Sequence, residues 1–140
     1  KVKLINNFYK TKIKKTPKIA ITGLNPHCES VEKISEEKIH IIPAIKRLKK
    51  NRVSIEGPFS ADTIFIENQI KKFDVIVGMY HDQVLGPIKA LYNFEAINIT
   101  LGLPFLRVSP DHGPNQKMFG KNLSDPDSLL QAIKFLNTQA

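Results

Sequence analysis

Two histidines stand where short apolar stretches of the chain end. An apolar run, Val75, Ile76, Val77 and Met79, which is mostly β-branched, leads into Tyr80-His81-Asp82-Gln83, and residues 18–23 run into Leu24-Asn25-Pro26-His27. Such runs predict buried strands, and open α/β sheets carry their chemistry beyond the carboxyl ends of their strands. A histidine beside an aspartate there can bind a metal ion or act as a general acid or base. A turn with a structurally satisfied histidine is the alternative.

Four further polar residues lie near expected strands. Asp62 follows a strand expected over residues 52–56, although it could instead be a helix N-cap. Lys89 lies two turns beyond the His-Asp pair, and Asn98 lies within a strand expected over 96–100. Arg107 is placed in the middle of an apolar strand, which is unfavourable unless the guanidinium meets an anion. Imidazoles with carboxylates suit zinc, manganese or magnesium, and Lys and Arg suit phosphate. We therefore expect a small anionic substrate bound together with a metal ion.

Helical patterns separate these strands. The sequence predicts helices over residues 1–13, from Ser35 to about 50, over 84–92, and from Ser124 or Asp125 onward. The first has no capping residue, which suggests that the chain is a fragment. Pro43 is expected to kink the second helix or to begin it, and His40 is expected at the surface. The buried faces are predicted to contain Ile39, Ile42, Ile45 and Leu48 in the second helix and Leu129, Leu130, Ile133, Phe135 and Leu136 in the last.

Alternating strands and helices predict an α/β fold, with a three-layer architecture and a mainly parallel sheet. The sequence contains neither a GxGxxG loop nor a Walker sequence, so a Rossmann or P-loop nucleotide site is not expected. With 140 residues, 41% hydrophobic and 24% charged, the chain is long enough for one domain or a piece of one. It has no apolar run of about 18 residues and no secretory signal pattern, so we expect a cytoplasmic protein with no membrane partner.

The single cysteine and the excess of basic residues each allow two interpretations. Cys28 cannot form an internal disulfide; it could be a nucleophile beside His27, or simply a small apolar residue. Lys plus Arg number 21 against 13 for Asp plus Glu, giving +8. The basic clusters at residues 10–18 and 46–52 lack interleaved aromatics, so we interpret them as solvated surface and expect no nucleic-acid partner.

Four motifs together resemble one enzyme family. They are Gly23-Leu-Asn-Pro-His27, Gly57-Pro-Phe-Ser-Ala-Asp-Thr63, Met79-Tyr-His-Asp-Gln83, and Asn98-Ile-Thr-Leu-Gly-Leu-Pro-Phe-Leu-Arg107 with Asp111-His-Gly113. The chain resembles the C-terminal part of the 4-hydroxythreonine-4-phosphate dehydrogenases of vitamin B6 biosynthesis. The resemblance implies an incomplete fold of the isocitrate/isopropylmalate dehydrogenase kind, a homodimer with its site at the interface, NAD or NADP, and a divalent Zn, Mg or Co ion.

The resemblance also implies roles for individual residues. His27 and His81 would bind the metal within joint reach of one cation, and Asp62 or Asp82 would be the catalytic base. A third metal histidine and a His-Thr substrate pair would belong to sequence absent here, leaving the fragment inactive alone. Residues 1–140 would be the C-terminal portion of a two-domain dehydrogenase, with about 1–110 on the substrate and metal side and about 111–140 on the cofactor side. The remaining assignments are substrate binding by Lys89, Asn98 and Arg107 and cofactor binding by Asp111, His112, Gly113 and Asn115.

The implied reaction is oxidation, with decarboxylation, of the phosphorylated substrate 4-phosphohydroxy-L-threonine. The sequence departs from the family pattern at residues 28–32, after His27, and at residues 114–117, where it weakens the expected cofactor contacts. Two other functions remain open. One is a metal-independent phosphate acyltransferase of related fold, and the other is a non-catalytic basic binding module.

Overall fold

The structure is a computed structural model, and it describes residues 1–28, 34–93, 95–114 and 116–139. The chain divides into two compact units, Lys1–Pro87 and Ile88–Ala140. This division by packing differs from the division by function expected near residue 110, which stays a prediction. Within the described ranges, no helix is both long and apolar enough to cross a membrane.

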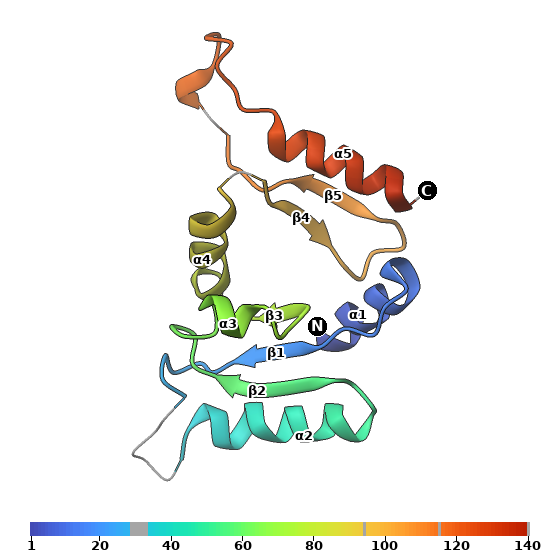
Figure 1. The fold of residues 1–140 in the computed structure, drawn as a ribbon, viewed down its shortest axis with the longest axis vertical. Coiled ribbons are helices and arrows are strands. Elements are labelled where there is room, and N and C mark those ends of the chain that lie inside the picture. Colours follow the sequence, from blue (N-terminus) through green and yellow to red (C-terminus); the bar gives the residue numbers. More distant parts are fainter. Residues whose placement is uncertain (29–33, 94, 115, 140) are drawn as a thin grey trace. The chain divides into compact units, whose positions relative to one another are not determined.

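A three-stranded parallel sheet forms the centre of the first unit (Figure 1). Its strands are β1 (Ile19–Thr22), β2 (Ile55–Phe59) and β3 (Val75–Val77), in the order β2-β1-β3. Ile19 pairs with Ile55 on one side and with Val75 on the other, so all three strands run the same way. Every residue of β1 is buried, as expected for the central strand of a parallel sheet. The predicted parallel sheet is confirmed here.

Helices connect these strands. The predicted first helix is present as α1 (Val2–Phe8) followed by a π-helical turn, η1 (Tyr9–Ile13). A second π-helical turn, η2 (Glu37–Ile41), leads into α2 (Ile42–Lys50), with Pro43 in the first turn of α2. The short α3 (Glu67–Ile70) precedes β3, and α4 (Asp82–Tyr92) follows it.

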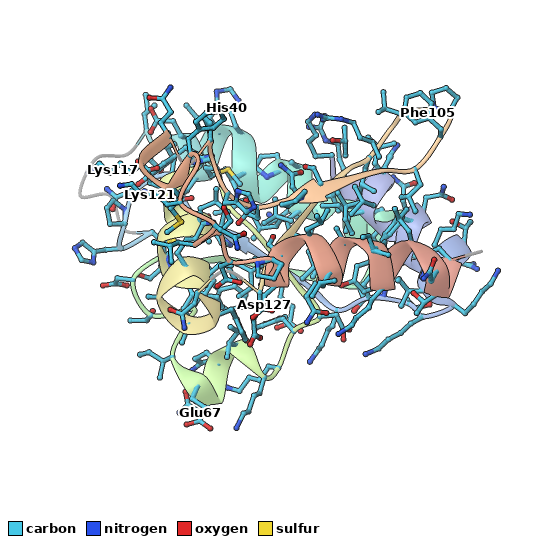
Figure 2. All side chains as sticks on the ribbon, turned by 90° about the horizontal axis from the view of Figure 1, so that it is seen from above. His40, Glu67, Phe105, Lys117, Lys121 and Asp127 are labelled. Atoms are coloured by element: carbon cyan, nitrogen blue, oxygen red, sulfur yellow. The ribbon has the colours of Figure 1, made fainter. Side chains whose placement is uncertain are left out.

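The hydrophobic core lies between the sheet and the second helical segment. Its buried residues are Ile19, Ile21, Ile41, Ile45, Val53 and Ile55. Each such aliphatic side chain contributes about 1.5–3 kcal/mol on full burial. The sequence prediction placed Ile39 in this core, but Ile39 is 50% exposed and Ile41 is buried instead. The reason is the π-helical turn, which holds an extra residue per turn and so rotates the apolar face. His40 lies exposed on η2, as expected (Figure 2).

Strand β2 begins later than the sequence predicted. Arg52 adopts a left-handed conformation with φ of 57°, so the chain is still turning there, and the strand continues through Gly57 to Phe59. Gly57 has φ of 129°, and a Cβ at this position would lie 2.5 Å from the carbonyl oxygen of Ile21. Only glycine lets the strands approach this closely while the pairing register shifts.

The second unit contains an antiparallel strand pair and a helix. Strand β4 (Ile97–Thr100) pairs with β5 (Arg107–Pro110), and η3 (Gln116–Met118) and α5 (Asp127–Gln139) follow. The Asp125 side chain accepts a 2.9 Å hydrogen bond from the Asp127 amide, which confirms the predicted helix start. Phe105, in the loop between the strands, is 63% exposed (Figure 2).

The buried face of α5 differs from the prediction. Ser128 and Ala132 are buried where α5 packs on β4 and β5, because these small side chains allow close approach. Phe135 is half-buried. The expectation that four larger residues face this core is wrong, since Leu129, Leu130, Ile133 and Leu136 are each at least 40% exposed.

Candidate functional site

The carboxyl ends of the three parallel strands carry the sequence-predicted metal and acid residues. His27 follows β1, Asp62 follows β2 and His81 follows β3. Because β1 lies between the other two strands and all are parallel, the three segments leave from the same edge of one sheet. The expectation that both histidines follow strands at one edge is therefore confirmed, whereas their joint binding of a cation stays a prediction.

His27 and Asp62 form a direct pair across this edge. The distance from His27 Nδ1 to Asp62 Oδ2 is 3.7 Å, and the side chains are 73% and 52% exposed. The Ser60 hydroxyl donates to Asp62 Oδ1 and lies 2.5 Å from the Pro26 carbonyl oxygen. The hydrogen bond from Ser60, with a smaller effect of His27, lowers the pKa of Asp62. Asp62 is thus ionised at neutral pH, and its side chain faces the His27 loop.

A buried carboxylate holds the loop that carries His27. Glu37, only 3% exposed, accepts a 2.8 Å hydrogen bond from the Asn25 amide. That backbone hydrogen bond lowers the pKa of Glu37 despite its burial. Asn25 Oδ1 in turn accepts a 3.0 Å hydrogen bond from the His27 amide. These contacts hold the backbone at the base of the His27 side chain.

Cys28 does not have the surroundings of a reactive thiol. Burial raises its pKa, and the nearby carboxylates of Glu37 and Asp62 raise it further. The thiolate is the nucleophilic form, so a raised pKa lowers reactivity near neutral pH. The geometry favours the interpretation of Cys28 as a small packed side chain, next to Gly23.

His81 and Asp82 lie at the start of α4. The His81 carbonyl accepts a 3.1 Å hydrogen bond from the Leu85 amide, which makes His81 part of the first helical turn. Both side chains are exposed, in contrast to Gln83, whose side chain is buried and only 6% exposed. The predicted helix over 84–92 is confirmed and begins slightly earlier, at Asp82.

In the second unit, a residue predicted to bind the substrate contacts a residue predicted to bind the cofactor. Lys89 Nζ lies 3.0 Å from Asp111 Oδ2 and also donates to the Asp111 carbonyl. Ser128 holds Asp111 from the other side by accepting a 2.9 Å hydrogen bond from its amide. The substrate candidate Lys89 therefore contacts the cofactor candidate Asp111 directly.

Asn98 and Arg107 lie on one face of the β4–β5 pair. Asn98 is opposite Ser109 and Thr100 is opposite Arg107, so these four side chains share a face. The prediction that Arg107 occupies the middle of a buried strand is wrong. Arg107 is the first residue of β5, it is exposed, and its Nη1 donates a 3.0 Å hydrogen bond to Thr100. Its charge is solvated, so no buried anion is required to stabilise it.

The expected cofactor loop is exposed after Asp111. His112 Nδ1 lies 3.2 Å from the Gly113 carbonyl oxygen, and both residues are exposed. Asn115 lies outside the described residues. The cofactor role of this loop stays a prediction.

The side chains at the sheet edge fit part of a divalent-cation site. A neutral imidazole whose Nδ1 faces a carboxylate leaves Nε2 available as a ligand, which is the common arrangement around bound metals. His27 with Asp62 provides this chemistry, and His81 adds a second imidazole at the same edge. Across the described parts of the chain, no three His, Cys, Asp or Glu side chains come together as a ligand group. The described residues thus supply a partial ligand set.

Sequence patterns did not reveal the buried polar residues that support this edge, namely Thr22, Glu37 and Gln83, nor Ser128, which holds Asp111 in the second unit. Glu37 lies near the start of the helix predicted from Ser35, and that prediction assigns it no further role. A signal was available for Gln83, because it stands beside the apolar Val84 in the first turn of a helix that must pack on the sheet.

Comparison with known proteins gives one consistent result. Residues 1–136 match the family described as pyridoxal phosphate biosynthetic protein PdxA. A 4-hydroxythreonine-4-phosphate dehydrogenase from Sulfurihydrogenibium sp. is 49% identical over 136 residues, which are 96% of this chain and 42% of the relative. A relative from Oceanobacillus iheyensis, provisionally named a D-threonate 4-phosphate dehydrogenase, is 45% identical over 121 residues, 85% of this chain and 36% of its own length.

A solved structure agrees with this assignment. The crystal structure of a 4-hydroxythreonine-4-phosphate dehydrogenase from Burkholderia phymatum superimposes with a TM-score of 0.75 at 35% identity, covering 95% of this chain and 41% of that one. The chain therefore has part of an isocitrate dehydrogenase-like α/β fold. It spans about two fifths of the length of the curated relatives that it matches. The chain belongs to the PdxA family of pyridoxal phosphate biosynthetic proteins, of which it resembles the C-terminal part.

Proposed function

We propose that this chain contributes to a metal-dependent, NAD-linked dehydrogenase that oxidises and decarboxylates 4-phosphohydroxy-L-threonine in vitamin B6 biosynthesis. The observation that carries the proposal is the sheet edge where His27 pairs with Asp62, and His81 follows the neighbouring strand. The names of the relatives support the reaction and the substrate. A phosphate acyltransferase needs no such paired imidazole and carboxylate.

In this proposal His27 and His81 would hold a divalent Zn, Mg or Co ion through ring nitrogens. Asp62, 3.7 Å from His27 Nδ1, orients the ring electrostatically, a role in which a lowered pKa is an advantage because the carboxylate stays ionised. When bound, the cation would lower the pKa of the substrate hydroxyl and stabilise negative charge as carbon dioxide leaves.

Asp62 and Asp82 remain the candidates for the base that removes the hydroxyl proton. Lowering the pKa of a carboxylate makes it a weaker proton acceptor. The hydrogen bond from Ser60 therefore makes Asp62 the poorer choice. We assign removal of the hydroxyl proton to Asp82, at the start of α4; bound NAD or NADP would supply the hydride acceptor.

The substrate phosphate is assigned to the second unit. Arg107 presents an exposed guanidinium on the same face as Asn98, and a guanidinium matches the geometry of phosphate oxygens. Lys89 adds a second cation, held by Asp111. In the assembled enzyme we expect a homodimer with the site at the interface, and residues 111–113 on the cofactor side.

A chimera tests the function directly. The 136 residues of the Sulfurihydrogenibium relative that match this chain are replaced by this chain, and NADH formation is followed with 4-phosphohydroxy-L-threonine and added zinc or magnesium. We expect turnover, and we expect His27→Ala or His81→Ala to abolish most of it. Supply of D-threonate 4-phosphate in a parallel assay tests the specificity suggested by the Oceanobacillus relative.

Two controls make this assay decisive. His40→Ala changes an exposed histidine on η2 that the proposed site does not include, and it should leave turnover unchanged. A folded, dimeric chimera that oxidises neither substrate would contradict the proposal, as would full activity in His27→Ala.

A further inference from the structure

The buried amide of Gln83 connects the two strand ends from which the histidine segments depart. Its Oε1 accepts hydrogen bonds from the Thr22 hydroxyl and from the Met79 amide, each at 2.8 Å, and its Nε2 donates to the Gly23 carbonyl at 2.8 Å. Thr22 ends β1 and Gly23 follows it directly, and Met79 lies two residues beyond the end of β3. A single side chain therefore joins β1, β3 and the first turn of α4.

These hydrogen bonds fix the orientation of the Gln83 amide. Reversing oxygen and nitrogen would place the amide donors against the Met79 N–H and an acceptor against the Gly23 carbonyl. The surrounding backbone is also closely packed: a Cβ on Gly78 would lie 2.7 Å from Val84 Cγ1, and one on Gly23 would lie 2.5 Å from Cys28 Sγ. The start of α4 thus has little room to shift against the strands.

We propose that Gln83 is a positioning residue for the cation site, holding the segment with His81 at a fixed spacing from the β1 end that leads to His27. It does so through backbone and hydroxyl groups and touches neither the substrate nor the cation. Polar groups that orient metal ligands typically change metal affinity by about 10- to 100-fold when removed. The part of this inference that concerns cation affinity rests on the proposed function.

Gln83→Met tests the proposal on the 140-residue chain, because methionine fills a similar volume without the hydrogen bonds. Zinc affinity is measured by calorimetry, and amide hydrogen exchange is followed at Met79, Val84 and Leu85. We expect zinc affinity to fall at least about tenfold. We expect exchange to accelerate by a similar factor over all three amides, including those of Val84 and Leu85, which donate to the His81 carbonyl rather than to Gln83.

Asp74→Asn is the matched control. It weakens hydrogen bonds at the opposite, amino end of β3, so it should lower stability while leaving zinc affinity and exchange at Val84 and Leu85 unchanged. Thr22→Val removes one of the three partners and should give a smaller fall in zinc affinity, and it replaces Gln83→Met in the test if that variant fails to fold.

The outcomes separate the two proposals. If the unmodified chain binds no zinc but Gln83→Met still accelerates exchange at Val84 and Leu85, the positioning role stands and the proposed cation site fails. A folded Gln83→Met variant with unchanged zinc affinity, or with faster exchange at Met79 alone, would overturn the positioning role. If only Thr22→Val folds, unchanged zinc affinity and unchanged exchange in that variant would also overturn the positioning role.

Discussion

Asp74→Asn is expected to lower the free energy of unfolding at neutral pH by about 1 kcal/mol, and the loss should disappear in acid. Asp74 Oδ2 accepts a 2.8 Å hydrogen bond from the Lys18 amide, and Oδ1 lies 2.5 Å from Lys15 Nζ. A hydrogen bond to a charged group contributes about 1.5–3 kcal/mol, roughly twice a neutral one. Asparagine keeps an acceptor, so about half of that contribution is lost. The Lys15 pair adds little, because its ammonium side chain is 59% exposed and screened by water.

The sign of the pH dependence follows from the lowered pKa of Asp74, caused first by the hydrogen bond from Lys15 and then by the Lys18 amide. A carboxyl group whose pKa is lower in the folded state stabilises the protein above its unfolded pKa, near 3.9, and loses that effect as the pH falls through the folded value. Urea unfolding of both proteins at pH 7 and at several values below 4 measures the difference.

The difference between the two proteins should be greatest at pH 7 and absent well below the folded pKa. Glu56→Gln provides the control, because Glu56 pairs with Lys18 only at 3.8 Å and both side chains are about half exposed, so little change is expected. Equal stability of Asp74→Asn and the unmodified chain at pH 7 would refute the reasoning, and so would a difference that persists unchanged in strong acid.

Four other outcomes can be checked. In the active chimera, Arg107→Ala should raise KM by an amount corresponding to about 2–5 kcal/mol with little change in melting temperature, and unchanged kinetics with a large drop in melting temperature would reassign Arg107 to structure. The 140-residue chain alone, assayed with 4-phosphohydroxy-L-threonine, NAD and zinc or magnesium, should show no turnover; a rate equal to that of a full-length relative would contradict this. Ser128→Ala should destabilise the second unit by about 1–3 kcal/mol in urea unfolding, because Ser128 bonds both the Asp111 amide and the Ala96 carbonyl. Alkylation of Cys28 by iodoacetamide should have a pH midpoint above that of a free thiol, since burial raises its pKa.

The sequence was most informative where a local pattern determines the structure. The β-branched run at residues 75–77 and the apolar run at 19–22 form adjacent parallel strands, and their polar ends place His27 and His81 at one edge. The residue types alone were enough to predict these two strands, because a short apolar run rich in β-branched residues is typical of a buried strand. The helix starts near Ser35 and Asp125 followed equally from local capping chemistry.

The errors arose where packing or backbone geometry overrides the local pattern. Ile39 was predicted as buried from regular helical spacing, which a π-helical turn alters without any evident sequence signal. The strand expected over residues 52–56 continues to Phe59, because Gly57 lets β2 pass close to Ile21. Gln83 and Glu37 were missed because they act through hydrogen bonds to backbone groups elsewhere in the chain, the Gly23 carbonyl and the Asn25 amide. Residue spacing does not reveal such partners.

The parallel edge assigns packing and chemistry to different residues of the same chain segments. Ile19, Ile21 and Ile55 lie within the strands and are buried, while His27, Asp62 and His81 lie beyond them on three separate connections. A replacement or change of length in these connections can therefore alter the proposed site while the buried residues of the strands are unchanged. Such an arrangement allows substrate preference to diverge through changes in the connections, at little cost in folding.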